Sequence, residues 1–444
     1  MLYRQNIEES LNSWKENEKR KPLVIMGARQ VGKTTLIQSF GKAKYEDVAY
    51  FNFELNKELH DFFRLNISPE RIIENLTLFR RRAIDVTKTL IIFDEIQECP
   101  EALTSLKYFQ EENVKYHLIA AGSLLGITLG QKRSFPVGKV EFLDLNPLSY
   151  EEYLRNTNEK LYQTYVHFLN EDLAKIPMAF FEPLLEEFKA YMICGGMPEP
   201  VSVFSESKDI GKLQKVQDQI LRSYRLDFSK HTTPTNANRI QYVWNSITSQ
   251  LAKENKKFIY KAVKKGARAR EYESAITWLH QAGIIHQVYN VTNPALPLTA
   301  YRDLSAFKIY LLDVGLLMRM SQLNPSALIN GNKLFKEFKG SFTENYVAQS
   351  LTKSLKNPPS YWTSNRTAEV DFLIEHNNHI IPIEVKSGKT TRSRSLAEYN
   401  RKYKPAIRVR LSPLNIDTDG TFINIPIFYC DKLEVFINKM DRLN

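Results

Sequence analysis

A glycine-rich turn between an apolar run and a helix-forming stretch constrains this fold most. The turn reads G-x-x-x-x-G-K-T and comprises Gly27, Ala28, Arg29, Gln30, Val31, Gly32, Lys33 and Thr34, followed by Thr35. The apolar residues 22–26 predict a strand before it, and residues 34–40 predict a helix after it. Glycines let successive backbone N–H groups point inward at an anion, and the helix adds its positive dipole end. The turn therefore predicts a phosphate-binding loop.

Two residues of this loop have predicted roles in binding ATP. Lys33 can reach the β- and γ-phosphates, and the Thr34 hydroxyl can hold Mg²⁺. The alternative is a glycine-rich turn that caps an ordinary α/β unit. The strand before the turn and the helix after it favour the nucleotide site.

A second apolar run, residues 89–93, ends in two acids, Asp94 and Glu95. Such a run predicts a buried parallel strand that delivers carboxylates to the edge of the sheet where its strands end. Asp94 can hold Mg²⁺ through its water shell, and Glu95 can orient or activate the water that attacks the γ-phosphate. Ser123 follows the next predicted strand, where it can sense the γ-phosphate or that water, or can simply cap a helix or form a turn.

Composition limits the class of protein. The chain has 444 residues, 43% apolar and 25% charged, so we expect a globular protein of several domains. Its apolar runs are too short to span a bilayer, and its first residues lack the apolar core of a signal peptide, so we expect a cytoplasmic protein without membrane contact. The three cysteines are too scattered for a disulfide framework or a zinc site. A net charge of +11 indicates a polyanionic partner but does not locate it.

The N-terminal motifs resemble those of the AAA-type ATPases of bacterial and archaeal genomes. The resemblance lies in the phosphate loop, residues 93–97, residues 121–123 and residues 140–153, and residues 195–199 resemble the family's GG-x-P turn. It implies a helical lid over residues 151–230 and a fused C-terminal domain.

One position departs from the family pattern. Relatives commonly carry a Gly-Arg pair where this chain has Gly138-Lys139. Arg presents a planar fork and Lys a point charge, so a γ-phosphate sensor or finger at this position is in doubt. Arg133 is a possible substitute.

Residues 231–330 predict a winged helix. Three helical segments are followed by Gly283 and by two strands, 284–289 and 306–310. Basic residues precede the third helix or lie in its first turn: Lys261, Lys264, Lys265, Arg268 and Arg270. In DNA readers such residues hold phosphates. The rival interpretations are a rigid spacer between domains and a solvated charged face.

The C-terminal part predicts a helix over 335–355 and an antiparallel strand pair, 368–374 and 380–386. Because residues i and i+2 of a strand face the same side, Glu384 and Lys386 project together. Asp371 on the neighbouring strand can lie beside them, and Glu344 on the helix can complete the cluster.

This arrangement resembles the PD-(D/E)xK nuclease fold, closest to its archaeal Holliday-junction-resolvase-like members. The resemblance implies that Glu344, Asp371 and Glu384 hold Mg²⁺ or Mn²⁺, and that Lys386 positions or activates the attacking water. The alternative is a structural ion pair between one of the acids and the lysine.

The sequence therefore predicts a multidomain α/β protein with four parts. They are a P-loop ATPase core with a parallel sheet (1–150), a helical lid (151–230), a winged helix (231–330) and a restriction-endonuclease-like domain (331–444). The predicted function is ATP hydrolysis that gates a nuclease-like, DNA-binding domain. The alternative is a signalling or interaction switch, in which ATP sets a homo-oligomeric state and the nuclease-like fold is catalytically silent.

Overall fold

The computed structural model of the chain describes residues 2–65, 67–112, 115–129, 138–230, 232–253, 257–324, 336–364, 368–388 and 394–442. The chain divides into two compact units. Unit 1 comprises Met1–Asn146 with Gln281–Ile284, and unit 2 comprises Pro147–His280 with Ile285–Asn444.

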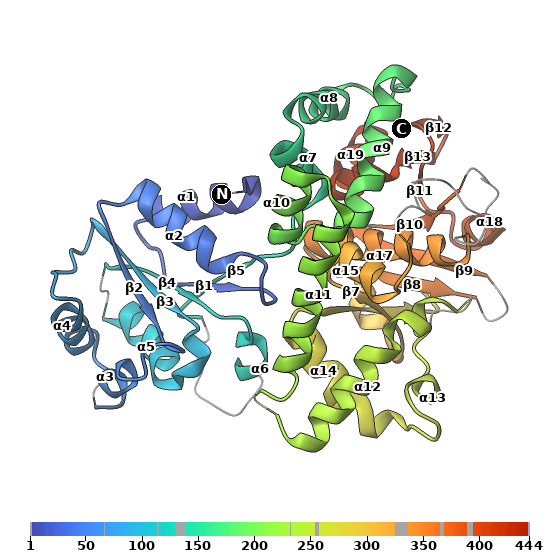
Figure 1. The fold of residues 1–444 in the computed structure, drawn as a ribbon. Coiled ribbons are helices and arrows are strands. Elements are labelled where there is room, and N and C mark those ends of the chain that lie inside the picture. The colour runs from blue at the N-terminus through green and yellow to red at the C-terminus, as the bar shows by residue number, and fades with distance from the viewer. Residues whose placement is uncertain are drawn as a thin grey trace. The chain divides into compact units, whose positions relative to one another are not determined.

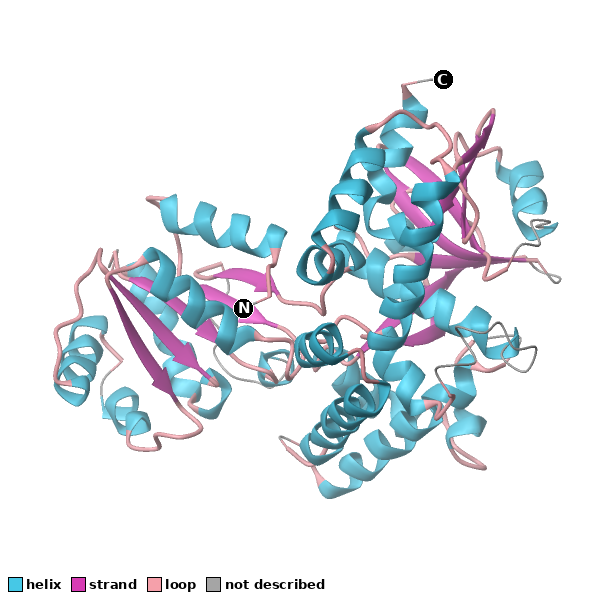
Figure 2. Cartoon of the chain, turned by 45° about the horizontal axis from the view of Figure 1, so that its top comes forward, coloured by secondary structure: helices cyan, strands magenta, loops and turns pink. Residues whose placement is uncertain are grey.

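Unit 1 is built on a five-stranded parallel sheet. Its order is β2 (Asp47–Asn52), β3 (Thr89–Asp94), β4 (His117–Ala121), β1 (Leu23–Met26) and β5 (Glu141–Asp144). Helices lie on both sides of this sheet (Figure 2), and β3 is buried at every position because both of its faces are covered. Since β4 lies between β1 and β3, the loops that follow these three strands meet at one edge of the sheet. The predicted P-loop sheet is thus confirmed.

The helices of unit 1 are α1 (Gln5–Glu16), α2 (Lys33–Lys44), α3 (Leu59–Leu65), α4 (Pro69–Arg80), the 3₁₀ turn η1 (Ile96–Glu98), α5 (Pro100–Glu111) and α6 (Leu125–Leu129). Below the sheet edge, aromatic side chains of β3 and its neighbours form the core. The Phe93 ring lies 5.5 Å from Phe53 and 5.6 Å from Phe63, edge to face in both pairs. Burial of such a ring stabilises the fold by roughly 1.5–3 kcal/mol, which fixes the end of β3 in place.

Unit 2 begins with helices in the region predicted as a lid. They are α7 (Tyr150–Thr157), α8 (Glu159–Asn170), α9 (Met178–Cys194), α10 (Pro198–Ser207) and α11 (Ile210–Asp227). A capping box starts α7, because Ser149 and Glu152 each bond the other's backbone N–H. Figure 1 shows these helices in green. Further helices follow along the chain: α12 (Pro234–Leu251), α13 (Tyr260–Val263), α14 (Ala269–Gln281), η2 (Leu298–Tyr301), α15 (Val314–Met320), α17 (Lys336–Ser354), α18 (Arg394–Tyr403), η4 (Ile427–Lys432) and α19 (Leu433–Asp441).

Unit 2 also holds an eight-stranded mixed sheet. Its order is β12 (Asp417–Asp419), β13 (Phe422–Pro426), β11 (Arg408–Ser412), β10 (His379–Val385), β9 (Glu369–His376), β8 (Ser360–Thr363), β6 (Ile285–Val291) and β7 (Asp303–Leu311). The predicted antiparallel pair is present as β9 and β10, with Phe372 opposite Ile383. Asn377 and Asn378 form the turn between them with positive φ values.

The predicted boundary at residue 330 divides this sheet. Strands β6 and β7 follow α12, α13 and α14 in the order predicted for a winged helix. However, β6 also pairs in parallel with β8, so that Tyr289 of β6 lies opposite Ser360 of β8. The hairpin is thus an edge of the larger sheet and not a separate wing, because an isolated two-stranded hairpin is only marginally stable. The division into four domains stays a prediction, and two compact units are what the structure describes. No helix in the described part of the chain is long and apolar enough to cross a membrane.

Candidate functional site

The phosphate loop of unit 1 is curled by residues in the left-handed backbone region. Gly27, Gln30 and Gly32 have φ values of 148°, 65° and 93°. A Cβ atom at Gly27 would lie 2.2 Å from the carbonyl oxygen of Leu145, so only glycine fits there. Gly32 is the N-cap of α2, and the first helical residue is Lys33. The loop thus has the conformation that an anion-binding nest requires.

Lys33 is buried in this loop, with 6% of its surface exposed. Its ammonium donates to the carbonyl oxygens of Gly27 and Ala28, each at 2.9 Å. Burial lowers the pKa of Lys33 to about 8, and the nearby carboxylates of Glu95 and Asp94 oppose that change. A cation that has already lost most of its water gains much from a phosphate oxygen.

Thr34 and Asp94 meet at the end of β3. The Thr34 hydroxyl donates to Asp94 Oδ2 at 2.9 Å, and the Tyr50 hydroxyl donates to the same oxygen at 2.7 Å. A hydroxyl beside a carboxylate is an oxygen donor set that suits Mg²⁺. Burial is the main reason that the pKa of Tyr50 is raised to about 12, so Tyr50 stays a donor. Sequence reasoning missed Tyr50, which lies on β2 next to β3.

Glu95 follows β3 directly and has a φ of 50°. The side-chain amide of Gln97 donates to Glu95 Oε2 at 2.6 Å, and the Ser123 hydroxyl lies 3.4 Å from the same oxygen. Gln97 is buried beneath Gly122, where an added Cβ would lie 2.0 Å from Gln97 Oε1. The structure brings Ser123 beside Glu95, and the roles predicted for the two residues stay predictions. It adds Gln97, which the 93–97 motif contains but does not single out.

Lys139 and Arg133 are the two basic residues that the sequence offers as a γ-phosphate sensor or finger. Lys139 Nζ lies 3.3 Å from Glu111, so it forms an ion pair with α5. Arg133 lies outside the described residues.

In unit 2 the predicted nuclease-like residues gather at β9, β10 and α17. Asp371 Oδ2 accepts the backbone N–H of Val385 at 2.7 Å. Glu384 Oε1 lies 2.5 Å from Lys386 Nζ, and Glu344 Oε2 accepts the Tyr310 hydroxyl at 3.3 Å. Burial, then the charges of Glu344 and Glu384, raise the pKa of Asp371 well above its usual value. Asp371 therefore lies within electrostatic reach of both other acids.

A fully buried lysine on β7 belongs to the same cluster, and sequence reasoning missed it. Lys308 Nζ lies 2.5 Å from Glu369 Oε1 on β9. Burial favours loss of its proton, but Tyr310, Glu344 and Glu369 raise the pKa of Lys308 well above its usual value. A lysine inside the apolar run 306–311 is the signal in the sequence, because an unpaired buried charge is too costly to keep.

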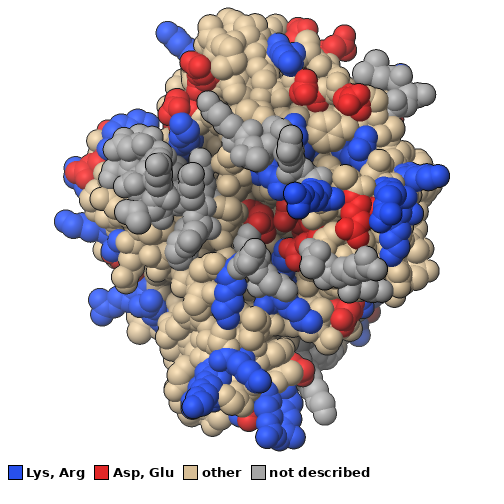
Figure 3. Space-filling model, turned by 90° about the vertical axis from the view of Figure 1, so that its right-hand side faces the viewer, with Lys and Arg blue, Asp and Glu red and all other residues tan. Residues whose placement is uncertain are grey.

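The cluster fits a divalent cation only in part. Glu384 Oε2 is buried without a hydrogen-bond partner, and such an oxygen is what a metal ligand offers. Yet across the described residues no group of three or more His, Cys, Asp or Glu side chains is arranged so that it could hold a metal ion. Figure 3 shows acidic side chains near the middle of one face, with Lys and Arg side chains around them.

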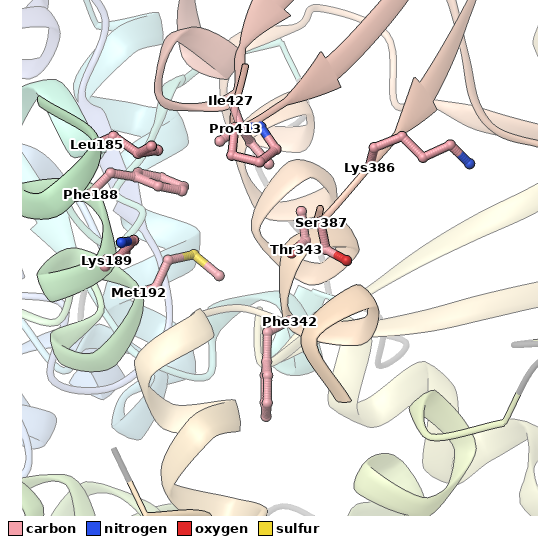
Figure 4. A pocket seen from close by; sticks show the side chains of 10 residues that line it. All are labelled: Leu185, Phe188, Lys189, Met192, Phe342, Thr343, Lys386, Ser387, Pro413 and Ile427. Carbon is pink, nitrogen blue, oxygen red and sulfur yellow. The ribbon is translucent and has the colours of Figure 1, made fainter. Parts of the chain in front are cut away.

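A small apolar pocket of about 70 Å³ lies beside Lys386 (Figure 4). It lies where β10, β11 and β13 end, against α9 and α17, and its apolar walls include Phe188, Met192 and Phe342. In Figure 4 the Lys386 side chain extends away from α9. The pocket is therefore a neighbour of the acidic cluster and has a different, apolar character.

Comparison with known families assigns the first of these sites. Residues 19–154 match the model of an AAA domain, residues 185–327 that of a domain of unknown function (DUF8612), and residues 339–428 that of another domain of unknown function (DUF4143). The AAA match contains the phosphate loop, Asp94, Glu95 and Ser123. The residues that the sequence predicts for the ATP site therefore lie inside a stretch that is similar to AAA domains. A search of the curated proteins gives no match.

Solved structures similar to this chain include three P-loop proteins. The Walker-type ATPase paby2304 of Pyrococcus abyssi is 16% identical, with 72% of this chain and 96% of that chain covered and a TM-score of 0.46. The Thermotoga maritima RuvB Holliday junction branch migration motor is 14% identical, with 66% of this chain and 90% of that chain covered and a TM-score of 0.31. The Aeropyrum pernix ORC1 protein in complex with DNA is 13% identical, with 73% of this chain and 92% of that chain covered and a TM-score of 0.29.

Proposed function

We propose that ATP hydrolysis in unit 1 gates a DNA-binding, nuclease-like site in unit 2. The observation that carries the ATPase part is the convergence of the phosphate loop, the Thr34–Asp94 pair and Glu95 at one sheet edge. The DNA part is supported by the acidic cluster with its adjacent Lys386, and by the net charge of +11.

Each residue of the ATP site has a task that follows from its position. The loop N–H groups and Lys33 bind the phosphates and stabilise the negative charge that develops on them. Thr34 and Asp94 would hold Mg²⁺, which neutralises phosphate charge when bound. Glu95 orients the attacking water and accepts its proton, and Ser123 is placed beside the same carboxylate.

In unit 2 the cation of the proposed nuclease-like site would be Mg²⁺ or Mn²⁺, with Glu384 as its first ligand because Glu384 Oε2 has no hydrogen-bond partner. Asp371 and Glu344 would have to rearrange to join it, since the described acids do not form a metal site as they stand. The cation would supply charge neutralisation at a phosphodiester. Lys386, whose ammonium already contacts Glu384, would position the attacking water.

A second function, an ATP-dependent interaction switch with a silent nuclease-like fold, is favoured by Lys308. Its ammonium is fully buried and bound to Glu369 among the same carboxylates. An internal cation of this kind stabilises an acidic cluster without any metal.

One experiment separates the two functions. ATP hydrolysis and cleavage of linear, branched and single-stranded DNA with Mn²⁺ are measured for wild type, Asp371→Ala and Glu95→Gln. We expect Asp371→Ala to keep ATP hydrolysis and lose cleavage, because Asp371 lies in unit 2 and not in the ATP site. Asp419→Ala, an exposed acid on β12, is the matched control and should behave as wild type.

Glu95→Gln tests the gating. We expect it to lower the hydrolysis rate by at least about 100-fold and to abolish ATP-dependent cleavage. Cleavage by Glu95→Gln at the wild-type rate would contradict gating. Retarded DNA mobility without products in the wild type would favour the switch.

A further inference from the structure

A polar cleft of about 490 Å³ lies in unit 2 between α12 and the loop 264–267. The side of α12 that lines it is one helical face, because Thr235, Asn238, Arg239 and Tyr242 occupy positions i, i+3, i+4 and i+7. Lys264 and Lys265 line the cleft from the loop. The cleft is separate from the acidic cluster at β9 and β10.

The cations of this cleft are not neutralised. Within the described residues, Arg239, Lys264 and Lys265 form no ion pair, whereas Arg80 and Arg82 of unit 1 both pair with Asp47. The acid at the cleft wall, Glu271, accepts the backbone N–H of Arg268 at 3.0 Å. Figure 3 shows Lys and Arg side chains gathered at the lower end of its face, where Figure 1 places α12 and α13. Such a field attracts a polyanion.

An aromatic side chain lies among these cations. Tyr242 is 43% exposed, and Lys264 Nζ lies 5.3 Å from the centre of its ring. The exposed face of an aromatic ring can stack on another flat, π-bonded group such as a nucleobase. Cations around an exposed aromatic ring are the combination with which proteins bind unpaired nucleotides, because the ring stacks on a base and the cations hold the phosphates.

We propose that this cleft binds single-stranded nucleic acid, with one base stacked on Tyr242 and the flanking phosphates held by Arg239, Lys264 and Lys265. The inference rests on the DNA contact in the proposed function and assigns it a strand state. An unpaired base can enter a concave site and stack on a side chain, whereas duplex bases stay stacked on one another.

The test is equilibrium binding of a labelled oligothymidine and of a labelled hairpin duplex, followed by fluorescence anisotropy with EDTA present to prevent cleavage. We expect Tyr242→Ala to weaken oligothymidine binding about tenfold and to leave duplex binding unchanged. Tyr242→Phe keeps the ring and should bind as wild type. The double variant Lys264→Ala/Lys265→Ala should lower the slope of log affinity against log salt by about 1.4, and Lys215→Ala on α11 is the exposed-lysine control.

Two results would overturn the inference. If wild type binds oligothymidine and Tyr242→Ala binds it equally well, or if Tyr242→Phe loses as much affinity as Tyr242→Ala, the stacking site is wrong and the DNA contact itself stands. If wild type binds neither oligonucleotide, the DNA part of the proposed function fails together with the inference.

Discussion

Glu95 is held by very few contacts for a residue with so central a proposed role. Its backbone is in the left-handed region, which costs a non-glycine residue on the order of 1 kcal/mol, and its carboxylate is bound by Gln97 and Ser123. Gln97 in turn is fixed by burial beneath Gly122. The orientation of the proposed base therefore depends more on the Gln97 amide, at 2.6 Å, than on the Ser123 hydroxyl, at 3.4 Å.

Gln97→Ala removes that amide. We expect kcat for ATP hydrolysis to fall roughly tenfold, since a positioned base contributes more than that, while KM for ATP changes little because Gln97 bonds to Glu95 and not to the phosphate loop. Steady-state kinetics measure both constants, and Lys42→Ala, on the exposed side of α2, serves as control. An unchanged kcat would show that Gln97 does not position Glu95.

The sequence predicts residues that follow one another within a motif better than residues that meet only in the folded chain. Lys33 and Thr34 belong to the phosphate-loop motif, and Asp94 and Glu95 stand at the end of one strand. The motif and the end of that strand therefore predict that these four residues lie close together at one edge of the sheet. Tyr50, Gln97 and Lys308 enter these sites from a neighbouring strand, a tight turn and a hairpin edge. Their positions depend on sheet register and burial, which a linear pattern does not contain.

Among the elements, the long periodic helices and the buried strands are predicted well and the short or exposed ones are not. Pro69 is the first residue of α4, where a proline fits because the N–H group that it lacks would have no partner within the helix. The three exposed residues of β12 lack any apolar alternation, and no prediction covers them. The pairing of β6 with β8 joins segments about 70 residues apart, so only tertiary packing decides it.

The turn at Gly195 and Gly196 shows how one buried carboxyl group joins two elements. Asp313, the N-cap of α15, accepts the backbone N–H groups of Gly196 at 2.6 Å and Leu316 at 2.9 Å. A Cβ atom at Gly195 would lie 2.2 Å from Asp313 Oδ1. Burial raises the pKa of Asp313 to about 6, so at neutral pH this junction holds a charge that is costly to keep.

This pKa predicts how the stability of unit 2 depends on pH. The folded state binds the Asp313 proton more tightly than the unfolded state, so the contribution is present below about pH 4 and is lost as the pH rises through about 6. From this group alone, the free energy of unfolding should fall by about 3 kcal/mol over that range.

Asp313→Asn removes the titration and keeps the side-chain shape. Urea unfolding of both proteins at about pH 4.5 and pH 7, followed by tryptophan fluorescence, measures the effect, because Trp244, Trp278 and Trp362 lie in unit 2. We expect the free energy of unfolding of the wild type to fall relative to that of Asp313→Asn as the pH rises from about 4.5 to 7. The same gap at both pH values would rule out this role for Asp313.

On the scale of the whole molecule, the chain combines a P-loop unit with a second unit, in which strands of the predicted winged helix and of the predicted nuclease-like domain share one sheet. The first unit could be predicted because its motifs are local and its strands are parallel and buried. In the second unit the antiparallel pair of β9 and β10 could also be predicted, but the pairing of β6 with β8 could not, because these two strands lie far apart in the sequence.

The central claim is that unit 1 binds ATP through Lys33, and equilibrium binding of a labelled ATP analogue in the presence of Mg²⁺ tests it most directly. We expect the wild type and Lys42→Ala to bind with equal affinity, and Lys33→Ala to bind at least about tenfold more weakly. Equal affinity of Lys33→Ala and wild type, or no binding by the wild type, would contradict the account.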